Sequence, residues 1–241
     1  NRGGLTPSGD SGPPSEGAGG GADRPAGGPA RLLVTAGDNT YPVTAPQVLD
    51  TNLFLPLRAT LARMPNYGTM GDHDIVFPGG RRALAEAFDW PGGGERYALR
   101  YGPVQVIALG LEADADDVAF ARRALRVPGP SARFVVTHRP IQEGSPMLPV
   151  IAGGDVTAVI SGHLHAYERR PRPEAPGVPF LTGGTGGAPR NSSHTPRSGD
   201  ADVHVAAFGL LRISLHGDRA DYEFVDIDGR TRDGFSAPLA P

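Results

Sequence analysis

The 241 residues of the sequence include no cysteine and no lysine. Without a thiol, the chain has no disulfide, no thiolate-bound zinc and no cysteine nucleophile. It also lacks any apolar run near the roughly 18–20 residues that a membrane-spanning helix needs, so we expect no membrane anchor within it. The net charge is -3. This balance shows no basic excess, and we therefore expect neither a nucleic acid nor a membrane surface as a partner.

Hydrophobic residues are scarce as well, at 39% of the chain, whereas glycine and proline number 35 and 25. Much of this excess lies in residues 11–30, and the first thirty residues carry one large apolar side chain, Leu5. That composition is typical of irregular segments that bury little apolar surface. We therefore expect a Gly/Pro-rich segment over residues 1–30 and a globular domain over residues 31–241.

Within residues 31–241, short apolar runs alternate with helix-like patterns. Residues 31–36, 134–137 and 156–161 are typical of buried strands. Residues 47–64 carry apolar side chains at helical spacing, and Pro56 should kink or split that helix. The remaining patterns predict helices over 81–88 and 114–125, a hairpin of strands 96–100 and 104–109, and a terminal antiparallel meander over 208–215 and 222–227.

Each of the three apolar strands runs directly into a polar cluster that contains Asp or His. The clusters begin at Gly37, His138 and Gly162. In sheets flanked by helices, functional sites gather at the carboxyl ends of the strands. We therefore expect these clusters to converge in space, although they are far apart in the sequence.

Four sequence blocks concentrate the residue types that bind metal ions. The blocks are GDNTY at 37–41, GDHD at 71–74, THRP at 137–140 and GHLHAYER at 162–169. In an extended segment, residues two apart point to the same side, so His163 and His165 can face one cavity. Imidazole suits zinc and iron, and carboxylates can bridge two ions. A surface loop with two solvated histidines is the alternative for this pair alone, but the position after a buried strand and the three similar blocks favour a metal site.

Taken singly, the other blocks leave alternatives open. Asp38 after a strand fits an Asx-turn or a helix N-cap as well as a ligand. Tyr41 fits a packing residue or a phenolate ligand of ferric iron, and His138 fits a structural histidine or a ligand. The block 71–74 fits a polar turn, or an imidazole at His73 that its acidic neighbours orient and keep protonated as a proton donor.

Together the four blocks resemble the metal-binding motifs of the calcineurin-like metallophosphoesterases, within them the purple acid phosphatase branch. That branch is marked by GDxxY, with a ligating tyrosine, and by GHxHxYER. The order and rough spacing of the blocks agree from Arg31 to Arg169, and the tail with FLTGGTGG from Phe180 and FVDIDG from Phe224 is also similar. The resemblance implies a mixed α/β fold, a four-layer αββα sandwich of two mixed β-sheets flanked by helices, with residues 31–241 as the catalytic domain.

The resemblance also implies a binuclear metal centre. In it Asp38 bridges two ions, which are iron paired with zinc, manganese or a second iron. The first ion is held by Asp10, Tyr41 and His165, and the second by Asp72, His138 and His163. A hydroxide that bridges the ions attacks phosphorus, and His73 protonates or stabilises the leaving alkoxide.

The chain departs from the family pattern in two places. The family opens with a strand that carries D-x-H or D-x-G, and the only candidate is Asp10 in Gly-Asp-Ser-Gly, 28 residues before Asp38. Asp72 stands where the family has Asn. Its extra negative charge would lower the electrophilicity of the second ion and repel a phosphate oxygen. Both departures favour a degenerate, non-catalytic binding domain as an alternative to an enzyme.

The implied function is the hydrolysis of small phosphate esters by an acid-phosphatase-like phosphomonoesterase. A phosphodiesterase or a nucleotide hydrolase of the same fold is the alternative, because substrate choice depends on loops such as 141–155 and 184–200 that the motifs do not specify. Members of this branch are commonly exported, so the resemblance also implies a secreted or periplasmic protein. No motif indicates an oligomeric state.

Overall fold

The computed structural model describes residues 30–189 and 201–239, and the predicted ligand Asp10 lies outside them. The strands are β1 (Leu33–Ala36), β2 (Asn66–Thr69), β3 (Tyr97–Tyr101), β4 (Val104–Ala108), β5 (Ala132–Thr137), β6 (Ala158–Ser161), β7 (Tyr167–Arg170), β8 (Phe180–Gly183), β9 (Val203–Val205), β10 (Gly209–His216), β11 (Arg219–Asp226) and β12 (Thr231–Pro238). The helices are η1 (Pro46–Val48), η2 (Asp50–Phe54), α1 (Leu55–Leu61), α2 (Asp72–Ile75), α3 (Gly80–Phe88), η3 (Pro91–Gly94), α4 (Ala115–Ala124) and α5 (Leu148–Ala152).

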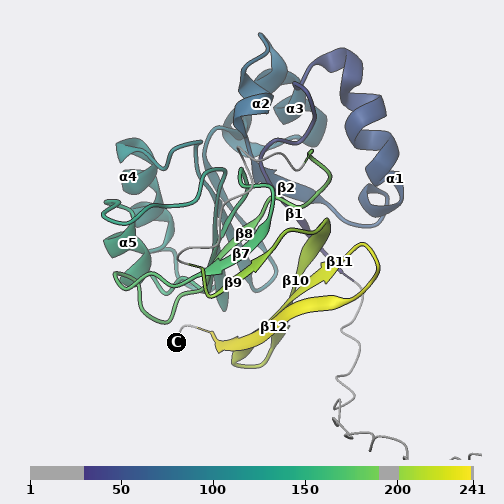
Figure 1. The fold of residues 1–241 in the computed structure, drawn as a ribbon. Helices are drawn as coiled ribbons and strands as arrows, with labels where there is room; N and C mark the ends of the chain where they lie inside the picture. The colour runs from purple at the N-terminus through teal and green to yellow at the C-terminus, as the bar shows by residue number, and fades with distance from the viewer. Residues whose placement is uncertain (1–29, 190–200, 240–241) are drawn as a thin grey trace, which may run out of the picture.

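The largest sheet has seven strands in the order β3-β4-β5-β6-β8-β7-β9. Its strands β8, β7 and β9 are labelled in Figure 1. The strands β4, β5, β6 and β8 run parallel. The edge strand β3 pairs antiparallel with β4, and β7 pairs antiparallel with β8 on one side and with the edge strand β9 on the other. Every residue of β5 is buried, as expected for a parallel strand covered on both faces. The parallel run brings the carboxyl ends of β5, β6 and β8 to one edge of the sheet.

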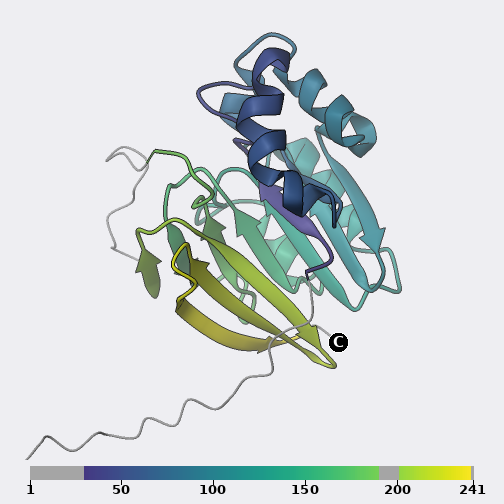
Figure 2. The ribbon, with the colours of Figure 1, turned by 90° about the vertical axis from the view of Figure 1, so that its right-hand side faces the viewer.

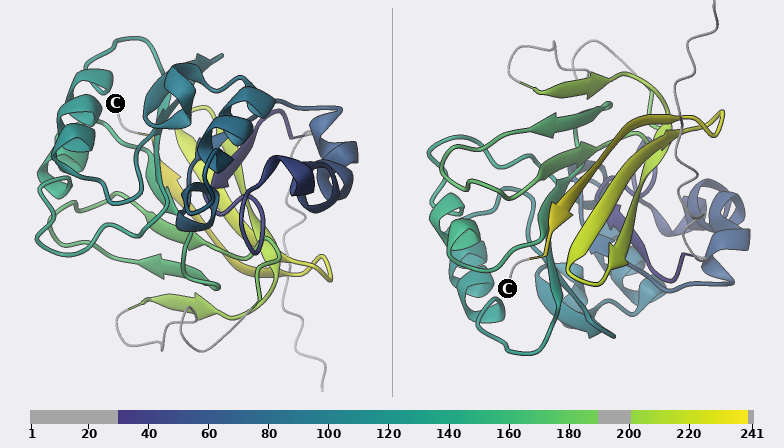
Figure 3. Two further views of the ribbon diagram at one scale, coloured as in Figure 1. Left: turned by 90° about the horizontal axis from the view of Figure 1, so that it is seen from above. Right: turned by 90° about the horizontal axis from the view of Figure 1, so that it is seen from below.

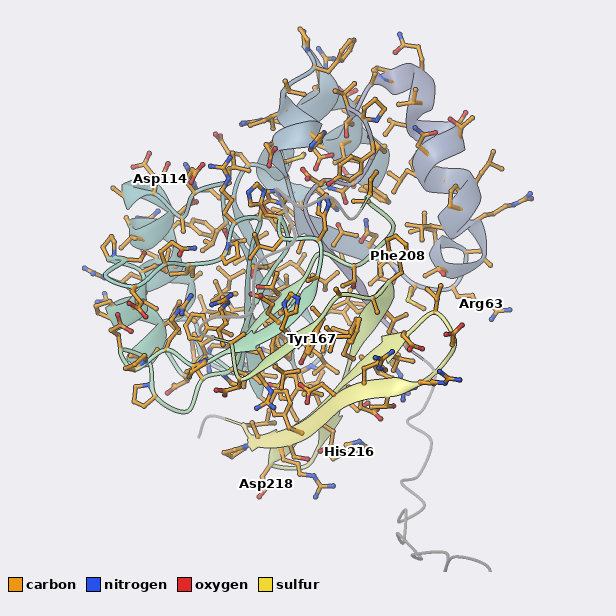
Figure 4. The ribbon with its side chains drawn as sticks, in the orientation of Figure 1. Arg63, Asp114, Tyr167, Phe208, His216 and Asp218 are labelled. Atoms are coloured by element: carbon orange, nitrogen blue, oxygen red, sulfur yellow. The ribbon has the colours of Figure 1, made fainter. Side chains whose placement is uncertain are left out.

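A second layer of strands consists of the parallel pair β1–β2 and the antiparallel sheet β10-β11-β12. Phe134 and Leu181 of the large sheet share one apolar cluster with Tyr222 of β11. The Tyr222 hydroxyl donates a hydrogen bond to the Thr157 carbonyl at 3.0 Å, which fixes the two layers in register. Tyr167, near the centre of the molecule in Figure 4, stacks on Phe224 with ring centroids 4.5 Å apart.

Helices cover both outer faces. The helices α4 and α5 pack on the large sheet through a cluster that includes Leu125, Leu148, Ile107 and Val135, and seen from below that sheet lies between them and the β10–β12 sheet (Figure 3). The helices α1 and α3 gather at the β1–β2 end (Figure 2). The order helix, sheet, sheet, helix confirms the predicted αββα sandwich of mixed sheets.

The helix predicted over residues 47–64 divides into η1, η2 and α1. Pro56 lies in the first turn of α1, directly after the π-helical η2, so its missing N–H falls at the point where the helical segment changes type. The predicted hairpin and meander are confirmed, but β12 completes the meander as a third strand. Short elements such as α5 and the polar strand β7 have too little periodicity to be found from the sequence. Among the described residues, no helix is long and apolar enough to cross a bilayer.

Candidate metal centre

The candidate site lies where β1, β5 and β6 end, as the sequence predicts. The chain after β1 turns at Gly37, whose φ of 84° favours glycine. A β-carbon there would lie 2.4 Å from His138 Nδ1, and one at Gly71 would lie 2.1 Å from Asp38 Oδ1. The two glycines therefore let the loops 37–41 and 71–74 approach each other and the end of β5.

One part of the site, here called the histidine half, consists of Asp38, Asp72, His138 and His163. Asp72 Oδ1 lies 2.9 Å from His138 Nε2 and 3.2 Å from His163 Nδ1. The two ring nitrogens are 3.3 Å apart, and Asp38 Oδ1 is 3.5 Å from His138 Nε2. Four donor atoms, one from each of the four sequence blocks, thus point at one another.

A hydrogen bond on the side of the ring that faces away from the site fixes the orientation of His138. This side chain is fully buried, and its Nδ1 lies 2.8 Å from the Ala36 carbonyl oxygen. A carbonyl oxygen only accepts, so Nδ1 carries a proton and Nε2 faces the site, where it is the atom that can bind a cation. Partial burial raises the pKa of the Asp72 carboxyl, but the charges of His138 and His163 lower it more, so this pKa lies below its usual range.

The other part, here called the tyrosine half, consists of Asp38, Tyr41 and His165. The Tyr41 hydroxyl donates to Asp38 Oδ2 at 2.7 Å and lies 3.1 Å from His165 Nε2. The Nδ1 atom of His165 lies 2.6 Å from the Pro189 carbonyl oxygen, which leaves Nε2 to face the site. Burial raises the pKa of Tyr41 above its usual value, and the hydrogen bond to Asp38 raises it further.

Asp38 links the two halves. Its Oδ1 faces His138, whereas its Oδ2 faces Tyr41. A carboxylate whose oxygens face two donor sets is suited to bridge two cations. The backbone N–H of His73 also donates to Asp38 Oδ1 at 3.0 Å and holds the carboxylate in this orientation.

His73 lies at the rim of the site, with a side chain that is 32% exposed. Its Nδ1 is 2.5 Å from the Pro42 carbonyl oxygen, and its ring packs against Tyr41 with centroids 4.5 Å apart. The Nε2 atom faces the site and is 4.0 Å from Asp72 Oδ2. Atoms of Asp38, Asp72 and His73 also lie within 4.8 Å of one another, so a ligand role competes with the predicted acid role.

The expected extended geometry of the H-x-H pair is wrong. Residues 163–166 form a bend, and His163 has a positive φ of 65°. The bend sends His163 to His138 and His165 to Tyr41, so the two histidines serve different halves of one cavity.

The donor set suits metal ions. The histidine half offers two imidazole nitrogens and two carboxylates, and the tyrosine half offers an imidazole, a phenol and a carboxylate. Nitrogen donors of this kind suit zinc and iron, and a phenolate is a hard oxygen donor. With carboxylates and imidazole lone pairs turned toward a common point, the cluster needs positive charge at its centre.

Comparisons with family profiles and with curated proteins give no match for the sequence. The fold, in contrast, matches solved structures. A purple acid phosphatase from yellow lupin (Lupinus luteus) seeds superposes on 86% of this chain with a TM-score of 0.67 and 18% identity. GAP50, the anchor in the inner membrane complex of Plasmodium, superposes on 88% with a TM-score of 0.60 and 14% identity. This chain has the calcineurin-like metallophosphoesterase fold.

The chain spans 46% of the lupin enzyme and 79% of GAP50. Within the metallophosphoesterase fold, the structure brings together every predicted site residue that it describes: Asp38, Tyr41, Asp72, His73, His138, His163 and His165. Of the histidines outside the four blocks, His216 lies near the end of the molecule opposite α2 (Figures 1 and 4), and His204 on β9 bonds the buried Glu168 at 2.9 Å.

Sequence analysis missed the residues that hold these ligands in place. The contact with the Pro189 carbonyl oxygen is not predictable from the sequence, because every residue has a backbone carbonyl. Asp74 is the last residue of the GDHD block, and it was expected to flank His73. Its carboxylate turns instead into the protein toward Asn39, Thr44 and Gly71. A buried acid between two ligand-bearing loops was detectable only from the block itself.

Proposed function

We propose that this protein hydrolyses phosphate monoesters at a binuclear metal centre. The observation that carries the proposal is the position of Asp38, whose two carboxylate oxygens face two separate donor sets. The lupin purple acid phosphatase, whose fold this chain shares, supports the proposal by its name. Function depends on the residues of the site and not on the fold that carries them.

In this proposal Asp72, His138 and His163 hold one ion and Tyr41 and His165 the other, with Asp38 between them. Asp10 would complete the tyrosine half. Iron with zinc, manganese or a second iron fits the mixture of nitrogen, phenol and carboxylate donors. Two such ions activate water at neutral pH and neutralise the charge of phosphoryl oxygens.

His73 is the proposed proton donor to the leaving group. Its Nδ1 donates to the Pro42 carbonyl, so a second proton on Nε2 is the one that can be transferred. The Nε2 atom faces the site and lies 4.0 Å from Asp72 Oδ2. The Tyr41 ring restrains the imidazole by packing against it.

A second candidate is a domain that binds metal without catalysis. The tyrosine half has three donor residues in the part of the chain that the structure describes, and Asp72 adds a negative charge where a phosphate would bind. The same fold also occurs in GAP50, an anchor. A phosphodiesterase or nucleotide hydrolase is the corresponding alternative among enzymes. The secreted or periplasmic location stays a prediction.

The test combines metal analysis with turnover. Purified protein is analysed for zinc, iron and manganese, and then assayed with an aryl phosphate, a bis-aryl phosphate and a nucleotide across a range of pH. Close to two ions per chain with preferred hydrolysis of the aryl phosphate supports the proposal. Metal without turnover of any substrate supports the binding domain, and preference for the diester or the nucleotide supports the alternative enzymes.

A further inference from the structure

Asp74 is a buried carboxylate that lies beside the metal centre and is no part of its donor set. Its side chain is fully buried, yet among the described residues no arginine or histidine pairs with it. An unpaired buried charge is costly unless hydrogen bonds compensate for it. The hydrogen-bond donors that surround the Asp74 carboxylate therefore indicate its role.

Four groups donate hydrogen bonds to Asp74. The Asn39 N–H donates at 3.0 Å and its side-chain amide at 2.8 Å, the Gly71 N–H donates at 2.8 Å, and the Thr44 hydroxyl lies at 2.5 Å. Three of the donors are N–H groups that cannot accept, and they occupy both oxygens, so the pocket requires a side chain that ends in two acceptor oxygens.

The donors come from both loops that carry metal ligands. Asn39 directly follows the bridging residue Asp38, and Gly71 directly precedes Asp72. Thr44 extends the network, because its hydroxyl also lies 2.7 Å from that of Thr40, next to Tyr41. One carboxylate thus ties the loop 37–44 to the loop 71–74 at points adjacent to two ligands.

Other contacts join the same loops. The Thr44 N–H donates to the His73 carbonyl oxygen at 3.0 Å, and one further contact uses a ligand atom. The His73 N–H donates to Asp38 Oδ1, the oxygen that faces His138. When Asp38 binds a cation, that oxygen is shared with the ion. The Asp74 carboxylate faces away from the donor set, so it holds the loops equally well with or without the ions.

We propose that Asp74 is a positioning residue, whose buried carboxylate holds Asp38 and Asp72 at the spacing that lets them share the metal centre. This inference rests on the proposed metal centre, but not on turnover. The simpler interpretation is that Asp74 only stabilises the fold, as any satisfied buried polar residue does.

Asp117 provides a control that separates the two interpretations. It is as deeply buried as Asp74, at 1% exposure, and accepts hydrogen bonds from the Gly110 N–H at 3.0 Å and from Arg96 at 3.0 Å. It lies on α4, which carries no ligand of the centre. Asp117→Asn removes a buried charge without touching the loops 37–44 and 71–74.

The variants to compare are Asp74→Asn, Asp74→Glu and Asp117→Asn. Asp74→Asn keeps the size of the side chain but brings an NH₂ group against N–H donors. We expect metal affinity, measured by chelator competition with Zn²⁺, to fall about 10–100-fold, the usual effect of outer-sphere substitutions. Asp74→Glu keeps an ionised acceptor and should restore part of the affinity. Asp117→Asn should lower the unfolding temperature with no change in affinity.

Hydrogen exchange of the metal-free proteins supplies a readout that needs neither metal nor substrate. We expect Asp74→Asn to speed exchange at residues 37–44 and 71–74 while β5 stays protected. Equal metal affinity in Asp74→Asn and wild type, or an equal loss in both Asn variants, would overturn the positioning role. If the wild type binds Zn²⁺ tightly but hydrolyses nothing, the proposed enzymatic function fails while the comparison of variants still decides the role of Asp74. A wild type that binds no Zn²⁺ overturns both.

If Asp74→Asn does not fold, Thr44→Val removes one donor of the network and leaves the carboxylate in place. The Thr44 hydroxyl is buried and lies in neither half of the centre. A smaller loss of affinity in the same direction supports the proposal, and unchanged affinity contradicts it.

Discussion

The two halves of the metal centre differ in how the chain builds them. In the histidine half, His138 directly follows β5, and His163 follows β6 after a single glycine; these are two neighbouring parallel strands in the middle of the large sheet. In the tyrosine half, Tyr41 lies on a loop and His165 on a bend that the Pro189 carbonyl orients. The first half is therefore attached to the most buried part of the fold, and the second to irregular segments.

This difference has a consequence for metal binding. The histidine half has four donor residues in place, whereas the tyrosine half has three in the described part of the chain. A preorganised set of donors loses less conformational freedom when it binds an ion. We expect the histidine half to bind its ion first and more tightly.

His138→Ala should have the largest effect. It removes a fully buried donor that both Asp38 and Asp72 face, so the ion of the histidine half and hydrolysis should both be lost, a decrease beyond about 100-fold. Metal analysis and aryl phosphate turnover measure it. His216→Ala, which changes a histidine at the opposite end of the molecule, is the control and should behave as wild type. Retention of both ions in His138→Ala would refute the proposed ligand.

His73→Ala should lower kcat about 100- to 10,000-fold, the usual contribution of a general acid, and leave the metal content unchanged. The deficit should shrink for substrates whose leaving group needs no proton, because an acidic phenol departs without one. A comparison of an alkyl with a nitrophenyl phosphate measures this. Loss of an ion in the variant would instead assign His73 to the donor set with Asp38 and Asp72.

Tyr41→Phe should affect the tyrosine half alone. The change removes the hydroxyl between Asp38 and His165, so the ion count should fall from two toward one while the ion at His138 stays. A ferric protein should lose its purple colour, because that colour comes from the bound phenolate. We expect activity to fall about tenfold or more. Tyr101→Phe, at an exposed tyrosine of β3, should keep the colour, and a Tyr41→Phe protein that stays purple would contradict the assignment.

The sequence predicts the architecture better than the local geometry. The strands 31–36, 134–137 and 156–161 are apolar enough to be found, and the carboxyl-end rule then places Asp38, His138 and His163 together. The path of residues 163–166 is not predictable in this way, because the bend depends on His163 adopting a positive φ against its intrinsic preference.

The supporting residues escape sequence analysis for another reason. The GDHD block contains two aspartates, Asp72 and Asp74, and the sequence alone does not show which of them faces the metal centre. They differ only in the structure, where α2 turns Asp72 toward His138 and buries Asp74 against Asn39. Because α2 is one short turn, small rotations decide which acid becomes a donor. Tertiary contacts with the loop 37–44 make that choice.

Asp72→Asn should have the smallest effect and is the most informative about catalysis. The amide oxygen can still face His138 and His163, whereas one negative charge leaves the place where a phosphate would bind. We expect kcat to be equal or higher, with a change below about tenfold, the lower limit for substitutions that disturb metal ligands. Steady-state kinetics together with metal content measures this. A gain in kcat at unchanged metal content means that the aspartate weakens a working enzyme. Loss of the ion from the histidine half would show that the charge itself is needed there, and the tighter half would then depend on electrostatics more than on its two histidines.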